Sequence, residues 1–129
     1  MRLIRTRAYA DEYRADHGRI NAYIAKTAAY TIPAKGFEGT VFTNRGASGS
    51  VTFTLPIAPK AGDRYAFAKS VSDQTIVVSS AGGLAIKGPS GGTTGSTLTD
   101  STTEFGFVEL ESDGYVWFQK AAVGTWALT

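Results

Sequence analysis

The chain has 129 residues, 43% of them hydrophobic, and it carries 13 Lys or Arg against 11 Asp or Glu. This length suits one domain with its own core, and a net charge of +2 is too small to indicate nucleic-acid binding by itself. The absence of cysteine excludes disulfides, thiolate catalysis and cysteine-ligated metal sites, and no apolar run approaches the roughly 20 residues that span a bilayer.

The first 28 residues differ in composition from the rest and predict a separate N-terminal arm. Residues 1–26 hold six Lys or Arg against three Asp or Glu, whereas the remaining chain holds seven against eight. Apolar side chains recur at spacings that place them on one face of a helix. Gly18 weakens that helix by about 1 kcal/mol relative to Ala, so we expect an arm that is only partly helical. The side chains on the common face are Tyr9, Tyr13, Ile20 and Ile24.

A basic arm of this kind is suited to contact another macromolecule. We favour a protein surface over nucleic acid, because no platform of aromatic and Arg residues follows the arm. A helix packed on the domain's own core is the other alternative. The segment lacks the apolar stretch of a secretory signal, which predicts that the protein is made in the cytoplasm. The residues predicted to bind the partner are Arg2, Arg5, Arg7, Tyr9, Tyr13, Arg14, Ile20 and Ile24.

The stretch from Gly39 to Pro59 gives the clearest strand pattern. Two β-rich runs flank a turn cluster at residues 44–49, whose side chains tolerate the conformations of tight turns. The second run alternates apolar residues with threonines, as in a strand with one buried face. We therefore predict a β-hairpin whose turn exposes Arg45. The apolar side chains of its buried face are Val51, Phe53 and Leu55.

Further β-rich segments, separated by turn signals, recur at intervals of about 8–12 residues, as in a sandwich or barrel. Residues 87–103 hold Leu98 as their only large apolar side chain and predict a long exposed loop. Asp113-Gly114 predicts a two-residue hairpin turn. The fold class is therefore all-β, a compact β-sandwich or jelly-roll-like barrel over residues 29–129, preceded by the arm. The other expected strands are 29–33, 64–71, 74–79, 84–86, 104–110, 115–120 and 123–128.

Residues able to carry chemistry are few. His17 is the single histidine, and nothing near it suggests the orienting partner that a catalytic histidine needs. Glu109, Glu111 and Asp113 alternate along a predicted strand, where three carboxylates would suit calcium, but we favour a solvated charged face. No phosphate-binding glycine loop occurs. We therefore predict no catalytic residue, no metal and no cofactor, and we expect that the protein is not an enzyme.

Aromatic residues near the C-terminus have two interpretations. They offer flat rings for sugar stacking, or they fill the core and a subunit interface, and we favour the second. Trp117 and Phe118 are adjacent, so they point to opposite faces of a strand and only one belongs to the core. The residues predicted as oligomer or ligand contacts are Arg45, Tyr115, Trp117 and Trp126.

Motifs spread over residues 29–129 resemble those of small β domains in virion proteins of tailed bacteriophages, including capsid decoration proteins, head fibres and tail-fibre appendages. The shared order is an opening strand, a polar hairpin that ends in Leu-Pro, a Gly-Asp turn, a long Ser/Thr/Gly loop, a Ser-Asp-Gly turn before a Trp, and a closing Gly-Thr-Trp. The stretches that carry this resemblance are Tyr30–Pro33, Gly39–Pro56, Lys60–Tyr65, Val108–Trp117 and Gly124–Trp126.

The resemblance implies a non-enzymatic structural protein of a virion, a decoration or appendage subunit that is often a homo-trimer. Its partners would be capsid or tail subunits. Independently of the resemblance, we expect no membrane contact, and a protein partner is favoured over nucleic acid. The arm would anchor the subunit while the β domain projects outward. The alternative is a receptor- or carbohydrate-binding fibre-tip module, in which Tyr115, Trp117 or residues 87–103 contact a saccharide.

Overall fold

The computed structural model describes residues 22–34, 36–72, 74–88 and 94–129. Over these ranges the chain forms strands and no helix, so the all-β prediction is confirmed, and no helix there is long and apolar enough to cross a membrane. The strands are β1 (Ala22–Ala25), β2 (Tyr30–Thr31), β3 (Thr40–Thr43), β4 (Val51–Thr54), β5 (Arg64–Ala68), β6 (Ile76–Ser79), β7 (Ile86–Lys87), β8 (Thr94–Gly95), β9 (Thr97–Asp100), β10 (Phe107–Ser112), β11 (Trp117–Val123) and β12 (Ala127–Leu128).

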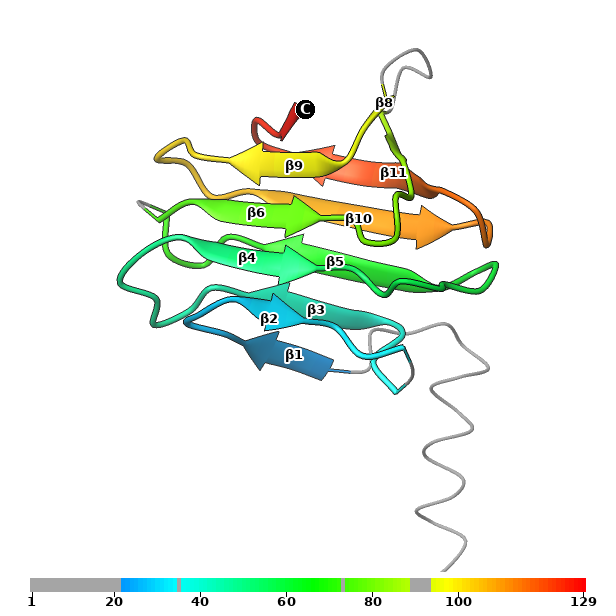
Figure 1. The fold of residues 1–129 in the computed structure, drawn as a ribbon. Helices are drawn as coiled ribbons and strands as arrows, with labels where there is room; N and C mark the ends of the chain where they lie inside the picture. The colour runs from blue at the N-terminus through cyan, green and yellow to red at the C-terminus, as the bar shows by residue number, and fades with distance from the viewer. Residues whose placement is uncertain (1–21, 35, 73, 89–93) are drawn as a thin grey trace, which may run out of the picture.

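The strands form two sheets, one in front of the other (Figure 1). Sheet A has the order β1-β3-β5-β10-β11-β7-β8, and sheet B has the order β12-β9-β6-β4-β2. Both sheets mix parallel and antiparallel pairs. The described residues therefore form an open two-layer sandwich, and neither a closed barrel nor the antiparallel pairing of a jelly roll occurs among them.

The first six strands alternate between the two sheets, and each strand lies beside the previous strand of its own sheet. In Figure 1 this order follows the change of colour from blue to green. β1, β3 and β5 pair in parallel in sheet A, and β2, β4 and β6 pair in parallel in sheet B. Partners are offset by 25 residues in both the β3/β5 and the β4/β6 pair. The chain thus winds in successive coils, each of which crosses from sheet A to sheet B through an arch.

The hairpin predicted for residues 39–59 is wrong, although its two strands and its buried face are correct. β3 lies in sheet A and β4 in sheet B, so the turn at residues 44–49 is an arch between the layers. Val51, Phe53 and Leu55 are fully buried, as predicted. A period-two pattern determines which face of a strand is buried, but it does not determine the strand to which its backbone bonds.

The fully buried side chain of Asn44 connects the arch after β3 with the arch of the next coil, between β5 and β6. Its Oδ1 accepts hydrogen bonds from the backbone N–H groups of Ser70 at 2.7 Å and Val71 at 2.9 Å. Its Nδ2 donates to the carbonyl oxygens of Val71 at 3.2 Å and Gln74 at 3.4 Å. One buried carboxamide therefore satisfies polar groups of the arch between β5 and β6 and ties two coils together.

β10 and β11 form the hairpin predicted around Asp113. The pairing closes at Ser112 and Trp117, so the connection has four residues instead of the predicted two. The Asp113 carboxylate accepts hydrogen bonds from the backbone N–H groups of Tyr115 at 2.8 Å and Val116 at 2.9 Å. The aspartate therefore stabilises a wider turn than a type I′ loop.

Residues 87–103 are not the long exposed loop that we predicted, because they include β8 and β9. β9 lies within sheet B, between β6 and β12. Its Leu98 is fully buried, and its Asp100 is buried in an ion pair with Lys69. Three of the four residues of β9 are polar, so one inward leucine was too weak a signal to indicate a strand.

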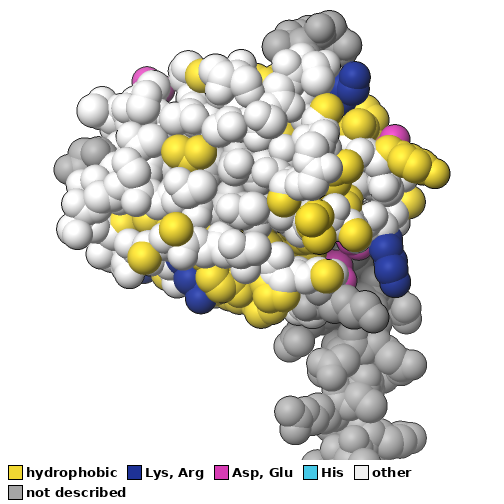
Figure 2. All heavy atoms as spheres, in the orientation of Figure 1, with side chains coloured by type: hydrophobic (Ala, Val, Ile, Leu, Met, Phe, Trp, Pro, Cys, Tyr) yellow, Lys and Arg dark blue, Asp and Glu magenta, His cyan; other side chains and the backbone are white. Residues whose placement is uncertain are grey.

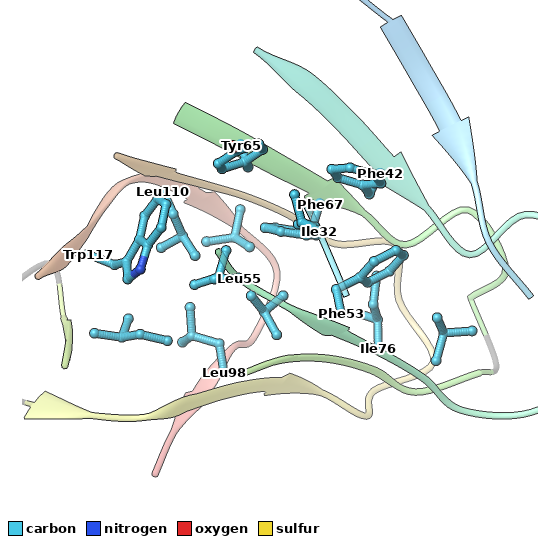
Figure 3. Close-up of a cluster of buried hydrophobic side chains, with 14 of the residues drawn as sticks. Ile32, Phe42, Phe53, Leu55, Tyr65, Phe67, Ile76, Leu98, Leu110 and Trp117 are labelled. Carbon is cyan, nitrogen blue, oxygen red and sulfur yellow. The ribbon is translucent and has the colours of Figure 1, made fainter. Parts of the chain in front are cut away.

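The core lies between the sheets, where side chains from both layers point toward one another (Figure 3). Phe42 of sheet A contacts Phe53 of sheet B with ring centroids 5.5 Å apart, and it stacks on Phe67 at 5.9 Å. Farther along the core, the ring centroids of Trp117 and Tyr65 lie 5.8 Å apart. Burial of each such side chain contributes roughly 1.5–3 kcal/mol relative to exposure, so these interleaved rings hold the two layers together.

Most of the predicted arm lies outside the described residues. This applies to His17 and to the predicted partner contacts Arg2, Arg5, Arg7, Tyr9, Tyr13, Arg14 and Ile20. Ile24 is described, and it lies in β1 instead of the predicted helix. β1 pairs in parallel with β3, and Ile24 packs against the core of the sandwich. Residues 22–25 therefore extend the edge of sheet A.

Candidate interaction surface

The carboxylates that suggested a calcium site are each engaged elsewhere. Glu109 lies 3.6 Å from Arg64 and Glu111 lies 3.2 Å from Lys120, in pairs that are partly exposed and therefore weak. Asp113 caps the β10–β11 turn, and hydrogen bonds from the backbone N–H groups of Val116 and Tyr115 lower the pKa of its carboxyl. Among the residues that the structure describes, no three His, Cys, Asp or Glu side chains gather where they could hold a metal ion.

The outer face of sheet A carries two rows of mainly apolar side chains that cross five strands. We call these rows the sheet A face. The cross-strand registers determine their members. The first row is Tyr23, Val41, Ala66, Glu109 and Ala121, and the second row is Ala25, Thr43, Ala68, Phe107 and Val123. Glu109 is the one charged member, and it is paired with Arg64.

The largest exposed apolar side chains of the sheet A face lie toward its two ends. Tyr23 on β1 is 71% exposed and Val123 on β11 is 65% exposed. Phe118, which lies outside the two rows on β11 opposite Glu111, is 38% exposed, whereas Val41 and Ala66 at the centre are buried. The face therefore exposes large apolar side chains toward both ends, while its centre is already covered. Exposed apolar side chains that gather on one face mark a candidate interaction surface.

The outer face of sheet B has a different composition. Its outward positions are rich in hydroxyl groups, and Figure 2 shows mostly uncharged polar and backbone atoms over β4, β6 and β9. Threonine and serine suit a pleated surface that faces water. The outward residues on these strands and their neighbours are Thr31, Thr52, Thr54, Val77, Ser79, Thr97, Thr99 and Ala127. The two faces of the sandwich are therefore chemically distinct.

The four residues predicted as exposed contacts have different environments. Arg45 is exposed in the arch after β3, and Tyr115 is 78% exposed in the β10–β11 turn. Trp117 is fully buried against Tyr65, so it is a core residue and offers no surface to a partner. Trp126 is half-buried, and its Nε1 donates to the carbonyl of Val123 at 3.1 Å. These residues do not form one site.

Sequence reasoning missed the residues that make up the sheet A face. Tyr23 was assigned to the arm, and Val123 was assigned to a closing strand without regard to its exposure. Tyr23 and Val123 belong to two different strands, β1 and β11, and they share a face only through the pairing of β1, β3, β5, β10 and β11. The prediction that Trp117 and Phe118 point to opposite faces follows from their adjacency in one strand, and it is confirmed, since Trp117 is buried and Phe118 is exposed.

No model of a protein family matches this sequence, and neither does any curated protein.

Proposed function

We propose that this chain is a non-enzymatic structural subunit of a bacteriophage virion, a decoration or appendage protein. Its N-terminal segment anchors it to a capsid or tail surface, and its β domain assembles as a homo-oligomer, a trimer being the expected form. The motifs described under Sequence analysis suggest the virion. The single observation that carries the assembly is the apolar sheet A face.

The sheet A face supports self-association because water is a poor environment for it. Tyr23 and Val123 expose most of their apolar surface, and the only charge in the two rows is the Glu109 carboxylate beside Arg64. Burial of apolar area contributes roughly 25 cal/mol per Å², so covering these side chains with a copy of the same face favours association. Closed symmetric assemblies are the common outcome for such surfaces.

The N-terminal segment supports the anchoring role through its charge and its position. Residues 1–21 lead directly into β1, which is the edge strand of sheet A. A segment with five arginines in 21 residues suits an acidic protein surface.

The oligomeric state tests the assembly. We expect the purified chain to elute as a homo-oligomer in size-exclusion chromatography with light scattering. Tyr23→Asp combined with Val123→Asp should give a folded monomer, since both changes place charge in the proposed interface. The matched control, Thr52→Asp with Thr99→Asp on the outer face of sheet B, should leave the oligomer intact. A wild-type chain that is monomeric at micromolar concentration would contradict the proposed assembly.

The anchoring role is tested on particles. Purified chain should bind virions or empty capsids of its phage and sediment with them. A chain lacking residues 1–21 keeps β1 and the sandwich, so it should remain folded and oligomeric but lose this binding. Equal binding by both chains would contradict the proposed anchor and leave the assembly through the sheet A face to be judged separately.

The fibre-tip alternative keeps one favourable observation, the 78% exposed ring of Tyr115 on a turn held by the Asp113 carboxylate. An exposed aromatic ring on a rigid turn is suited to stack on a sugar. Loss of host adsorption in Tyr115→Ala particles, together with hits of the wild-type chain on a glycan array, would favour this alternative.

A further inference from the structure

The most unusual polar feature of the described residues is the ion pair of Lys69 and Asp100. Both side chains are fully buried, and Lys69 Nζ lies 3.3 Å from Asp100 Oδ1. Lys69 directly follows β5 of sheet A and Asp100 ends β9 of sheet B, so the pair bridges the two layers. A buried ion pair is costly, because the loss of hydration of both ions offsets their attraction.

Thr102 contacts both members of the pair through three different groups. Its backbone N–H and its hydroxyl donate to Asp100 Oδ1 at 3.1 and 2.7 Å. Its carbonyl oxygen accepts a hydrogen bond from Lys69 Nζ. The two reactive groups are therefore held together from one side by a single residue of the chain.

The second carboxylate oxygen of Asp100 has different surroundings. Oδ2 is buried and has no hydrogen-bond partner among the described residues. It lies against the backbone of two glycines: a Cβ added to Gly124 would approach it to 3.4 Å, and one added to Gly106 would collide with it. A buried carboxylate oxygen without a donor is costly, because it has lost its hydration and gained no partner. The site thus stabilises negative charge at Oδ1 and disfavours it at Oδ2.

We propose that Lys69 and Asp100 condense to form an amide that covalently joins the two sheets. The groups are adjacent, dry and held in place, and the product removes two buried charges. This inference does not depend on the proposed function. It assigns a modification site inside the sandwich that needs no cofactor and no second protein.

The step balances without any co-reactant. A proton moves from the Lys69 ammonium to the Asp100 carboxylate, which leaves a neutral amine and a neutral acid. The lone pair of Nζ forms a bond to Cγ, and the carbonyl electrons move to Oδ1, where the N–H and hydroxyl of Thr102 act as oxyanion donors. A second proton passes from Nζ to Oδ2. The Cγ–Oδ2 bond then breaks, one water leaves and the carbonyl reforms at Oδ1.

The intact mass of the full, folded chain tests the proposal. It should lie below the sequence mass by one water, and this deficit should survive denaturation. A tryptic digest should then lack cleavage after Lys69 and contain a branched peptide that joins residues 65–87 to residues 88–120. Fragmentation should locate the bond at Lys69 and Asp100. The full sequence mass, with free Lys69 peptides, would overturn the proposal on the wild-type chain alone.

A succinimide at Asp113-Gly114 would also release one water, so variants must separate the two reactions. Lys69→Arg keeps the cation but has no amine to condense, and it should show the full sequence mass. Asp100→Asn should give the same cross-linked product as the wild type through loss of ammonia. A water deficit that persists in Lys69→Arg would overturn the proposal, because a succinimide does not need Lys69.

Thr102 is assigned as a positioning residue for the same reaction. Thr102→Val keeps the backbone N–H but removes the hydroxyl that donates to Asp100 Oδ1. Refolded Thr102→Val should accumulate the cross-linked mass at least tenfold more slowly than the wild type. Thr102→Ser, which keeps the hydroxyl, should accumulate the cross-linked mass at the wild-type rate. An unchanged rate would overturn the role of Thr102.

Discussion

Replacement of Asn44 by alanine should lower the free energy of unfolding by roughly 3 kcal/mol. The fully buried side chain accepts two backbone hydrogen bonds, from Ser70 and Val71, and donates to the carbonyls of Val71 and Gln74. The two accepted bonds contribute about 1 kcal/mol each, and leaving their N–H donors without an acceptor adds about 1 kcal/mol more. The lost hydrogen bonds lie at the arch that joins β5 to β6, so the packing of this third coil on the second should weaken first.

Urea unfolding, followed by the fluorescence of the buried Trp117, measures this loss. The midpoint should fall while the m-value stays the same, because the surface exposed on unfolding is unchanged. For a domain of this size the loss corresponds to a fall of roughly 10 °C in melting temperature. Arg45→Ala, an exposed neighbour on the same arch, is the control and should change stability by less than about 0.5 kcal/mol. Protein concentration must be fixed, since association shifts the midpoint. Equal effects of the two substitutions would refute the role of Asn44.

Three further substitutions test other parts of the sandwich. Burial raises the pKa of Tyr65, whose hydroxyl has no hydrogen-bond partner among the described residues; Tyr65→Phe should therefore leave stability unchanged or raise it by about 1 kcal/mol in urea unfolding. Leu98→Ala should cost about 2–5 kcal/mol, and Thr99→Ala less than about 1 kcal/mol; similar costs would contradict the placement of β9. The pKa of Asp113 is lowered from 3.8, chiefly by the backbone of Val116, so its stabilisation is present above pH 3.8 and is lost as the pH falls through the lower native pKa. The difference in melting temperature between wild type and Asp113→Asn should shrink over that range, and a constant difference would contradict the role of the carboxylate.

The sequence predicts the strands better than their pairing. Alternation in residues 51–55 identifies the face of β4 that is buried, since side chains on a strand point alternately to opposite faces. The same alternation is compatible with a hairpin or an arch, because it contains no information on the partner strand. Turn residues at 44–49 suit both connections. The deciding contact is between Asn44 and the arch beyond β5, more than 25 residues away in sequence.

The candidate surface depends even more on non-local pairing. Tyr23 and Val123 are a hundred residues apart in sequence, and they share a face only because three strands lie between their own. Trp117 was expected to be a contact because it is large and aromatic, yet it is fully buried, whereas its neighbour Phe118 is exposed. Composition alone cannot tell these roles apart, since a large aromatic ring is equally suited to a core and to an interface.

The positions that directly follow β1, β3 and β5 are aligned by the parallel registers, and all three are polar: Lys26, Asn44 and Lys69. The Lys26 ammonium lies 4.0 Å over the ring of Tyr30, Asn44 bonds to the arch of the next coil, and Lys69 reaches Asp100 in the opposite sheet. An apolar core accepts any strand with the correct alternation, so it does not by itself determine the order in which coils stack. Buried polar groups that find partners in only one arrangement penalise the others, because elsewhere they would be left unpaired. We therefore infer that the buried contacts of Asn44 and Lys69 select the winding, while the aromatic core supplies most of its stability.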